Sequence, residues 1–335
     1  TSPVSLATAR GRLSMAGTQT AAVASSGQTP SITTATEEYN NSATVITPGA
    51  WASQNAMNTG RTYIAGFGTP TTAVAAGGYT TAASALTEEY DGTNWTVGNV
   101  IGTARFSLGG CGTLTAGLIA GGGPSTPVKV LTEEYDGTNW TASGALNTGR
   151  AELSLFGIQT VAVAAGGGTV GGIKSAVTEE YDGSTWTTSP GSMNTARIQL
   201  PSGGAGTLTA GIIYGGNDGL PPAPVATGAT ETYDGSTWTS LSSLNTAIPG
   251  GISALQGTTT AALTGSGGGS LLGVEGYDGT SWSTRPSLAG VHGYGSGVGT
   301  QTTAMCFGGG PGTVATTELF TGETSAANIE TLTTS

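Results

Sequence analysis

Residues Thr87–Thr96 read Thr-Glu-Glu-Tyr-Asp-Gly-Thr-Asn-Trp-Thr, and nearly the same ten residues recur at Thr132–Thr141 and Thr178–Thr187. The aromatic residue at the fourth position can be followed through the whole chain. It occurs at Tyr39, Tyr90, Tyr135, Tyr181, Tyr233, Tyr277 and Phe320, with spacings of 51, 45, 46, 52, 44 and 43 residues. A steady period of this length is typical of proteins built from stacked structural repeats. The sequence therefore predicts seven repeats across its 335 residues.

A second motif precedes each copy of the first and ends in arginine. Its copies are Ala7–Arg10, Asn58–Arg61, Gly102–Arg105, Asn147–Arg150 and Asn194–Arg197, with degenerate copies at Asn245–Ile248 and Ala289–His292. A small-residue stretch that ends in consecutive glycines, as at Gly68–Gly78, separates the two motifs in repeats two to seven. Each repeat thus offers four short extended segments with turn signals between them, such as the Asp-Gly step after the anchor tyrosine.

Four strands in each of seven repeats predict an all-β fold, namely a single seven-bladed β-propeller that spans residues 1–335, with four antiparallel strands per blade. Ala, Gly, Ser and Val dominate the first two strands of each repeat, which suits the crowded inner strands around the axis. We expect Tyr and Trp to fill the gaps between sheets. We also expect each blade to consist of consecutive residues, with 325–334 as the fourth strand of the last blade and no exchange of strands at the closure.

The order of arginine, paired glycines, Glu-Tyr-Asp and tryptophan resembles the kelch repeat over nearly the whole chain. A WD40 assignment is weaker because neither Gly-His nor a terminal Trp-Asp pair recurs. More narrowly, the wording Asn-Thr-Ala-Arg, Gly-Thr-x-Thr-Ala and Thr-Glu-Glu-Tyr-Asp-Gly-Ser-Thr-Trp-Thr resembles Ala/Thr/Gly-rich kelch-like proteins of tailed bacteriophages of marine bacteria. The resemblance implies a propeller that serves as a platform for other molecules.

The residues that recur in most repeats are expected to be structural, because an active site needs unlike groups at one point. They are Glu37, Glu88, Glu133, Glu179, Glu231, Glu275 and Glu318, with Tyr90, Tyr135, Tyr181, Tyr233, Trp95, Trp140, Trp186, Trp238 and Trp282. The recurrent arginine is the natural partner of the recurrent glutamate, since its fork bonds a carboxylate well. We expect these pairs to fix the register between blades. Because Ile248 and His292 replace the arginine, the last two blades need other partners for the carboxylate.

The residues at the arginine position are also candidate ligand-binding residues: Arg61, Arg105, Arg150, Arg197 and His292. Because strands alternate in direction, the loops that carry them lie on the same face as the loops between the second and third strands. Those loops vary most in length and chemistry, as in the proline-containing segment 216–230. Scaffolds usually carry recognition on such variable loops.

The charge and composition of the chain argue against some classes of binding partner. The net charge is −11 and the only lysines are Lys129 and Lys174, which argues against binding nucleic acid or anionic lipid. No stretch is long and apolar enough to span a membrane, and no signal peptide is visible. The two cysteines, Cys111 and Cys306, lie in different repeats and are expected to be buried and unpaired.

The chain offers little chemistry. We expect no catalytic residues, no metal ligands and no cofactor. A copper site needs several histidines, and the one imidazole available to a triad, His292, occupies the position of the recurrent arginine. Asp182–Trp186 partly resembles the Asp box of sialidase-type propellers, although its Asp-to-Gly spacing is one residue short.

Three functions remain at this stage. The first is a non-enzymatic structural or adhesion module of a tailed phage (a tail, fibre or head decoration). It would dock to other virion proteins or to a host glycan or protein, as part of a multi-subunit assembly on a virion surface or in another extracellular setting. The second is a secreted or cellular kelch-type module that binds carbohydrate or protein. The third is a sialidase-like glycosidase.

Overall fold

The computed structural model describes residues 11–17, 21–31, 36–40, 44–123, 129–201, 203–219, 225–268 and 271–327. Its contacts define two compact units. One is Gly49–Gly322, and the other consists of residues on either side of that range.

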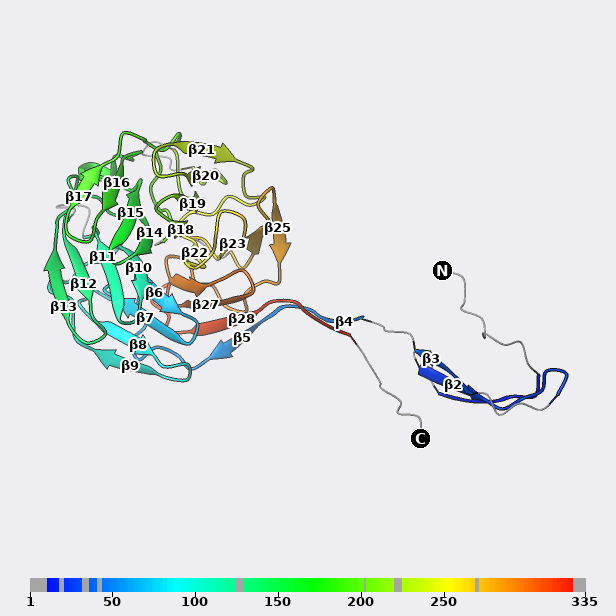
Figure 1. The fold of residues 1–335 in the computed structure, drawn as a ribbon. Helices are drawn as coiled ribbons and strands as arrows, with labels where there is room; N and C mark the ends of the chain where they lie inside the picture. The colour runs from blue at the N-terminus through cyan, green and yellow to red at the C-terminus, as the bar shows by residue number, and fades with distance from the viewer. Residues whose placement is uncertain are drawn as a thin grey trace. The chain divides into compact units, whose positions relative to one another are not determined.

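The Gly49–Gly322 unit is a β-propeller whose four-stranded antiparallel sheets surround an axis (Figure 1). Six such sheets, or blades, occur in the described residues. The first three blades are β6 (Ala65–Thr69), β7 (Thr72–Ala76), β8 (Thr87–Tyr90) and β9 (Trp95–Gly98); β10 (Gly109–Thr113), β11 (Ala116–Ala120), β12 (Thr132–Tyr135) and β13 (Trp140–Ser143); and β14 (Ser154–Ile158), β15 (Val161–Ala165), β16 (Thr178–Tyr181) and β17 (Trp186–Thr188).

The other three blades are β18 (Ala205–Thr207), β19 (Ala210–Tyr214), β20 (Thr230–Tyr233) and β21 (Trp238–Leu241); β22 (Ile252–Ser253), β23 (Ala262–Gly265), β24 (Val274–Tyr277) and β25 (Trp282–Arg285); and β26 (Ser296–Gly299), β27 (Thr303–Phe307), β28 (Thr317–Thr321) and β5 (Ala50–Gln54). A short 3₁₀ helix, Val170–Gly172, interrupts the loop before β16. The predicted four antiparallel strands per blade are therefore confirmed.

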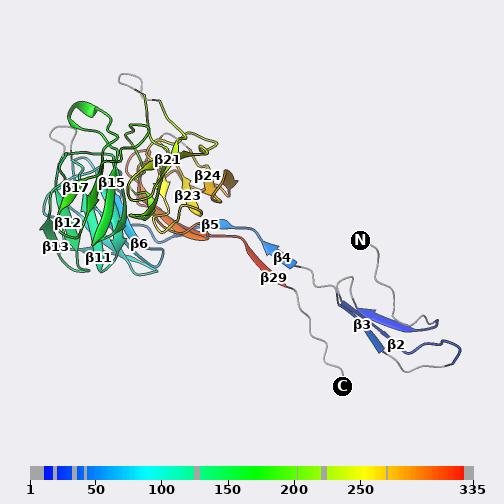
Figure 2. The same cartoon turned by 45° about the horizontal axis from the view of Figure 1, so that its top comes forward.

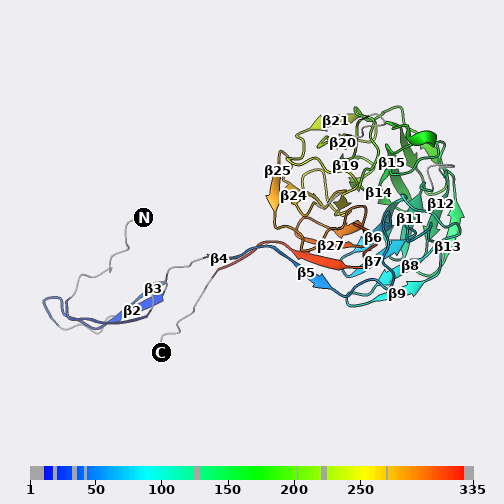
Figure 3. The ribbon, with the colours of Figure 1, turned by 180° about the vertical axis from the view of Figure 1, so that it is seen from behind.

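The closure differs from the prediction, because the propeller has six blades and not seven. Strand β5 pairs with β28, so a segment from the start of the chain completes the last blade and strands are exchanged after all (Figures 1 and 3). The tail is not the fourth strand of that blade: β29 (Thr324–Ala327) pairs instead with β4 (Thr44–Thr47). The rest of the predicted tail strand, 328–334, lies outside the described residues.

The first repeat forms a sheet of its own in the second compact unit. Strands β1 (Ser14–Gly17), β2 (Ala21–Ser25) and β3 (Thr36–Asn40) pair in that order. The strand that carries the tryptophan of this repeat, Trp51, is β5, and it belongs to the propeller. Trp51 follows the anchor Tyr39 by twelve positions, whereas Trp95 follows Tyr90 by five. The tight Asp-Gly turn that joins the third and fourth strands elsewhere is therefore missing here.

Figure 2 shows neighbouring blades side by side around the axis. The core of the propeller lies between them. In one such layer, Phe67 from β6 and Ile119 from β11 pack with Tyr135 from β12. The ring of Phe67 lies directly over Gly117, where an added Cβ atom would come within 2.2 Å of it. Small residues on the inner strands thus make room for aromatic side chains from the adjacent blade, as the sequence predicts.

Each tryptophan fastens its blade to the preceding one. The indole Nε1–H donates to a threonine hydroxyl in the third strand of the neighbouring blade, at 2.8–3.0 Å, in the pairs Trp95–Thr317, Trp140–Thr87, Trp186–Thr132, Trp238–Thr178 and Trp282–Thr230. Trp51 is the exception, because Val274 occupies the corresponding position. Its Nε1–H donates instead to the carbonyl of Pro286 at 2.9 Å.

Replacing one of these threonines gives a measurable prediction. Thr132→Val should lower the free energy of unfolding by about 1 kcal/mol, because the buried Nε1–H of Trp186 loses its acceptor while the side-chain volume is kept. Urea unfolding of the purified protein measures the difference. Thr141→Val, at an exposed position of β13, is the matched control and should change stability by less than about 0.5 kcal/mol. Equal effects from the two variants would show that the hydrogen bond contributes nothing.

Candidate binding site at the mouth of the propeller axis

The recurrent arginine and glutamate form buried ion pairs within single repeats. Arg61 Nη2 lies 3.0 Å from Glu88 Oε1, and equivalent pairs are Arg105–Glu133, Arg150–Glu179 and Arg197–Glu231. Glu88 also accepts the backbone N–H groups of Asn58 and Thr59, at 2.6 and 3.2 Å. The predicted pairing is therefore confirmed, but both partners belong to one blade. The pair fixes the loop that enters a blade to that blade's third strand, and does not set the register between blades.

The last two blades use other partners, as the sequence predicts. His292 replaces arginine and lies with Nε2 3.1 Å from Glu318 Oε1 and Nδ1 2.8 Å from the carbonyl of Gly308. Where Ile248 replaces arginine, Glu275 accepts the backbone N–H groups of Asn245 and Thr246 at 2.9 and 2.8 Å. In this blade the N–H donors satisfy the carboxylate where other blades add an arginine.

The residues at the arginine position are buried inside their blades. Arg61, Arg105, Arg150, Arg197 and His292 each have an exposed fraction of 0%, and each has a side-chain nitrogen that bonds to a carbonyl group of its own blade. The arginine fork closes the gap between the second and third strands from within. This geometry supports a structural role, and the predicted role in ligand binding stays a prediction. The anchor residues Tyr90, Tyr135, Tyr181 and Tyr233 are likewise buried.

A different position, two residues after each arginine position, encircles the axis. Its occupants in the six blades are Tyr63, Ser107, Glu152, Gln199, Gly250 and Tyr294, and all have φ between +50° and +58°. Such a backbone is strained for residues other than glycine, and it persists where surrounding structure enforces it. We refer to these six residues as the axial ring.

Backbone hydrogen bonds between neighbouring blades close the axial ring. The N–H groups of Ser107, Glu152, Gly250, Tyr294 and Tyr63 donate to the carbonyls of Tyr63, Ser107, Gln199, Gly250 and Tyr294 at 2.6–2.9 Å, and Leu200 N–H donates to Glu152 at 3.3 Å. The positive φ turns each N–H sideways toward the next blade. The scaffold thus places five side chains and one glycine on one rim, and unlike residues occupy equivalent places.

Sequence reasoning missed the axial ring, because it followed the residues that recur. The signal was nevertheless present: a position that changes from Tyr to Ser, Glu, Gln, Gly and Tyr sits two residues beyond a motif that is otherwise kept. Arg12 holds the same position in the first repeat and has φ of +55°.

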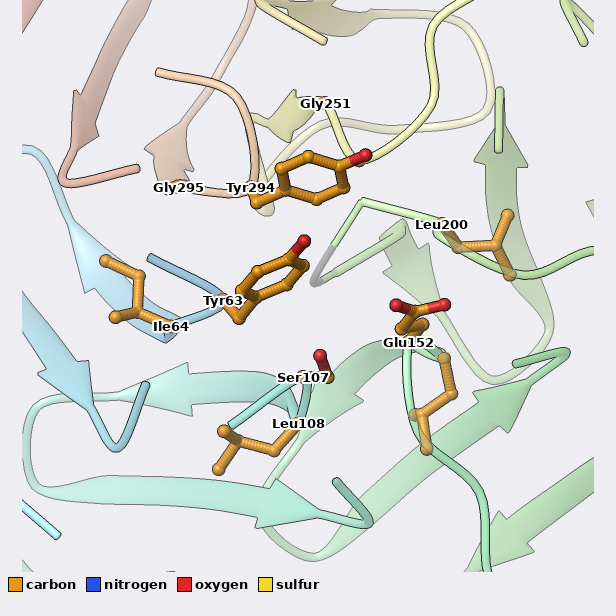
Figure 4. A pocket seen from close by; sticks show the side chains of 11 residues that line it. Tyr63, Ile64, Ser107, Leu108, Glu152, Leu200, Gly251, Tyr294 and Gly295 are labelled. Carbon is orange, nitrogen blue, oxygen red and sulfur yellow. The ribbon is translucent and has the colours of Figure 1, made fainter. Parts of the chain in front are cut away.

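The axial ring borders a cavity of about 30 Å³. Its polar lining includes Tyr63, Ser107 and Glu152, and its apolar lining includes Leu108 and Leu200. Figure 4 shows the hydroxyl groups of Tyr63 and Ser107 and the carboxyl group of Glu152 around a common space. Tyr63, Glu152 and Tyr294 are partly exposed, so the cavity is open to solvent at the rim.

Two tyrosines form one wall of this cavity. The rings of Tyr63 and Tyr294 lie 4.6 Å apart between centroids, with 31° between their planes. Tyr294 covers Gly250, where an added Cβ atom would come within 2.1 Å of the ring. Glycine in the ring position of the fifth blade therefore lets the tyrosine of the sixth lie across it. A second hollow, of about 270 Å³, lies beside the same tyrosines and is bordered by Gly310 and Pro311.

Glu152 is the one carboxylate of the axial ring. The backbone N–H and side chain of Gln199 bond to it, while Gln199 Oε1 accepts from Asn217 Nδ2 and, at 3.4 Å, from the Tyr294 hydroxyl. Burial raises the pKa of Glu152, and the two bonds from Gln199 only partly offset that effect. Burial, Tyr294 and Glu152 together raise the pKa of Tyr63 to about 12, so this hydroxyl stays neutral near pH 7.

The other end of the axis is apolar. A hollow of about 350 Å³ is bordered there by Gly112, Thr113, Phe156 and the segment Leu255–Thr258. Gln256 crosses toward the neighbouring blades, donating to the carbonyl of Gly68 and accepting the N–H of Gly299. This end has no charged lining residue among those described. The polar site is therefore confined to the face that carries the axial ring.

The Asp-Gly turns between the third and fourth strands act as local turn devices. Asp182 Oδ1 accepts the N–H groups of Ser184 and Thr185 at 2.8 and 2.7 Å, and these bonds hold its pKa well below the usual value. Asp234 makes the same bonds to Ser236 and Thr237. These side chains are exposed and engaged with their own turn, so the resemblance to an Asp box marks a turn and not a site.

Other features add little chemistry. Cys111 and Cys306 are buried and unpaired, as predicted. Within the described ranges, no group of three or more His, Cys, Asp or Glu side chains is arranged to hold a metal ion. No helix in the same part of the chain has the length and apolarity needed to cross a membrane.

Comparison with known proteins supports the fold. No family model matches the sequence, and no curated protein matches it. A solved structure described as "Structure of YjhT" is similar in fold, with a TM-score of 0.66, and the match covers 81% of this chain and 99% of that chain. The two sequences are only 12% identical over the match, so the likeness concerns the fold alone. Together with the six sheets, it establishes that this chain contains a β-propeller.

Proposed function

We propose that this protein is a non-enzymatic docking module on the surface of a tailed-phage particle, as a tail, fibre or head-decorating component, and that it binds partners through the face that carries the axial ring. The observation that carries the proposal is the contrast within the repeats. Buried positions repeat from blade to blade, whereas the axial ring presents a different side chain in nearly every blade. A scaffold that is uniform inside and individual at one rim is suited to recognition.

The chemistry of the rim favours binding over catalysis. Glycoside hydrolysis in its usual form requires two carboxyl groups, about 5 Å apart or somewhat farther. The described lining of the cavity contains one, Glu152. The assignment to a phage particle rests on the sequences of the repeats, together with few lysines and many small polar residues. A secreted or cellular kelch-type binding module is the alternative.

Mass spectrometry of gradient-purified particles tests the phage setting. The protein should co-sediment with the major capsid protein at a constant ratio across independent preparations. Its absence from particles, with the protein recovered free in the medium, would contradict the phage assignment and support a secreted module.

Binding of fluorescently labelled protein to host cells or purified particles tests the docking face. A variant with Tyr63→Ala and Glu152→Gln should lose most of its binding while its melting temperature stays close to that of the parent protein. The control is Asp182→Asn with Asp234→Asn, which alters the opposite face. Loss of binding in the control alone would show that docking uses the opposite face, and would contradict the proposal.

A further inference from the structure

Glu152 is partly exposed and differs from the buried glutamates of the propeller. Glu88, Glu133, Glu179 and Glu231 each face an arginine, and Glu318 faces His292. Glu275 is held by backbone N–H groups and the side-chain amide of Asn245. Glu152 receives only the bonds from Gln199, and within the described ranges it forms no ion pair. Holding a partly buried carboxylate without a cation is costly, and a bound cation would relieve that cost.

The space in front of Glu152 has the size of a small cationic group. A cavity of about 30 Å³ accommodates about two water-sized groups. An alkylammonium head is compact and presents three N–H donors. Three acceptor groups face the cavity, namely the Glu152 carboxylate and the hydroxyls of Tyr63 and Ser107 (Figure 4). A guanidinium group has four heavy atoms, about twice what this volume accommodates, and a trimethylated ammonium has no N–H to donate.

We propose that the mouth of the axis is a receptor for the primary ammonium group of a lysine side chain, presented by a loop of a partner protein. The inference rests on the proposed function, because it assumes that the face of the axial ring is the docking face. The Glu152 carboxylate carries the charge of the receptor, the hydroxyls of Tyr63 and Ser107 complete the acceptor set, and Leu108 and Leu200 contact the methylene stem.

A lysine side chain fits better than the other carriers of a primary ammonium. The ammonium of an amino sugar adjoins a ring that the cavity does not hold, whereas a lysine stem is unbranched and thin. The net charge of −11 favours encounter with a basic partner. A second copy of this chain is a poor donor, because it has two lysines and Lys174 Nζ already donates to the carbonyl of Asp218.

Calorimetric titration of the intact protein with n-butylammonium tests the receptor at pH 8 and constant ionic strength. Nα-acetyl-lysine-amide is the second ligand. Both should bind with millimolar affinity, whereas Nα-acetyl-norleucine-amide, methylguanidinium and tetramethylammonium should bind at least tenfold more weakly. Equal binding of tetramethylammonium would reduce the effect to unspecific charge attraction and overturn the proposal. Tighter binding of glucosamine than of butylammonium would overturn the assignment to lysine.

Variants separate the receptor from the scaffold. Glu152→Gln should weaken butylammonium binding at least tenfold, and Ser107→Ala should weaken it several-fold, with melting temperatures close to that of the parent protein. The matched control is Glu89→Gln, a carboxylate that accepts a hydrogen bond from Tyr135 between two blades, which should leave the affinity unchanged. Unchanged affinity in Glu152→Gln would remove the basis of the proposal.

The pH dependence gives an independent readout. The receptor needs ionised Glu152, so affinity should fall as the pH is lowered through the raised pKa of this carboxyl. The titratable groups that face Glu152 are Tyr63 and Tyr294, whose pKa values are raised, so they stay neutral in this range. Glu152→Gln should abolish the dependence, and a dependence that survives in this variant would contradict the proposal.

The outcome is distinguishable from failure of the proposed function. If ammonium probes do not bind while the Tyr63→Ala, Glu152→Gln variant still loses binding to particles or cells, the docking face stands and its ligand is another one. If ammonium binds as expected and the protein is absent from particles, the receptor stands and the phage setting fails.

Discussion

A chain that comprises only Gly49–Gly322 is expected to unfold in one cooperative transition, at nearly the temperature at which the propeller unfolds in the full protein. A chain that comprises Asn55–Gly322 is expected to melt at least about 10 °C lower. The difference between them is the segment that contains β5, the fourth strand of the last blade. Without it, β28 becomes an open edge and the ring loses one of its six outer strands.

The size of the effect follows from what β5 contributes. It is in register with β28 over its five residues, Ala50–Gln54. The side chain of Trp51 lies 5.1 Å from the ring of Phe320 and bonds to Pro286 in the neighbouring blade. Loss of several strand hydrogen bonds, at about 1 kcal/mol each, and of a packed tryptophan, at about 3 kcal/mol, exceeds 5 kcal/mol in all. A propeller of this size loses at least about 2 °C for each kcal/mol.

Thermal unfolding followed by circular dichroism measures both chains. A synthetic peptide of Gly49–Gln54 should restore part of the lost stability to the shorter chain, and the same peptide with Trp51→Ala should not. Equal melting temperatures for the two chains would show that β5 does not hold the ring closed. Failure of Gly49–Gly322 to fold, with the full chain stable, would instead show that the propeller needs residues outside this range.

The number of blades was the main error of sequence reasoning, and its cause is physical. The count rested on the anchor of the third strand, which occurs seven times, from Tyr39 to Phe320. A blade also needs a fourth strand, and that strand begins at or near a tryptophan. The chain has six tryptophans, and the structure places one in each blade. Counting the element that closes each sheet would have predicted six.

The candidate site was harder to predict, because repeat analysis finds what is shared. The pairing of glutamate with arginine could be predicted from charge and recurrence, and so could the substitution of that pair where Ile248 and His292 occur. The complete burial of the arginines could not be predicted, because a guanidinium group can bond a ligand as readily as a backbone carbonyl. The axial ring depends on a backbone φ near +55°, and the residue types at this position do not predict such a conformation.

The second large effect concerns the buried ion pair of the third blade. Arg150→Met should lower the free energy of unfolding by about 3–5 kcal/mol. Arg150 Nη1 donates to the carbonyls of Gly166 and Val177, both at 2.7 Å, and Nη2 donates to Glu179 at 3.0 Å. Burial lowers the pKa of Arg150, and Glu179 counteracts this, so each charge depends on the other. Methionine keeps much of the volume but removes the charged partner of a buried carboxylate, which keeps only the N–H groups of Asn147 and Thr148, and it removes one donor from each of two carbonyls.

Urea unfolding measures this loss of stability. Two further variants serve as the control and as a test of the charge pair. Arg12→Met removes an exposed arginine and should change stability by less than about 0.5 kcal/mol. Arg150→Met combined with Glu179→Gln should recover part of the loss, because the remaining side chain is neutral and still accepts the N–H of Asn147. The fifth blade, where Ile248 faces the same loop, shows that a blade folds without the arginine, so the variant should remain folded. A loss below 1 kcal/mol would mean that the carbonyls and the carboxylate find other donors, and that the arginine is retained for something other than stability.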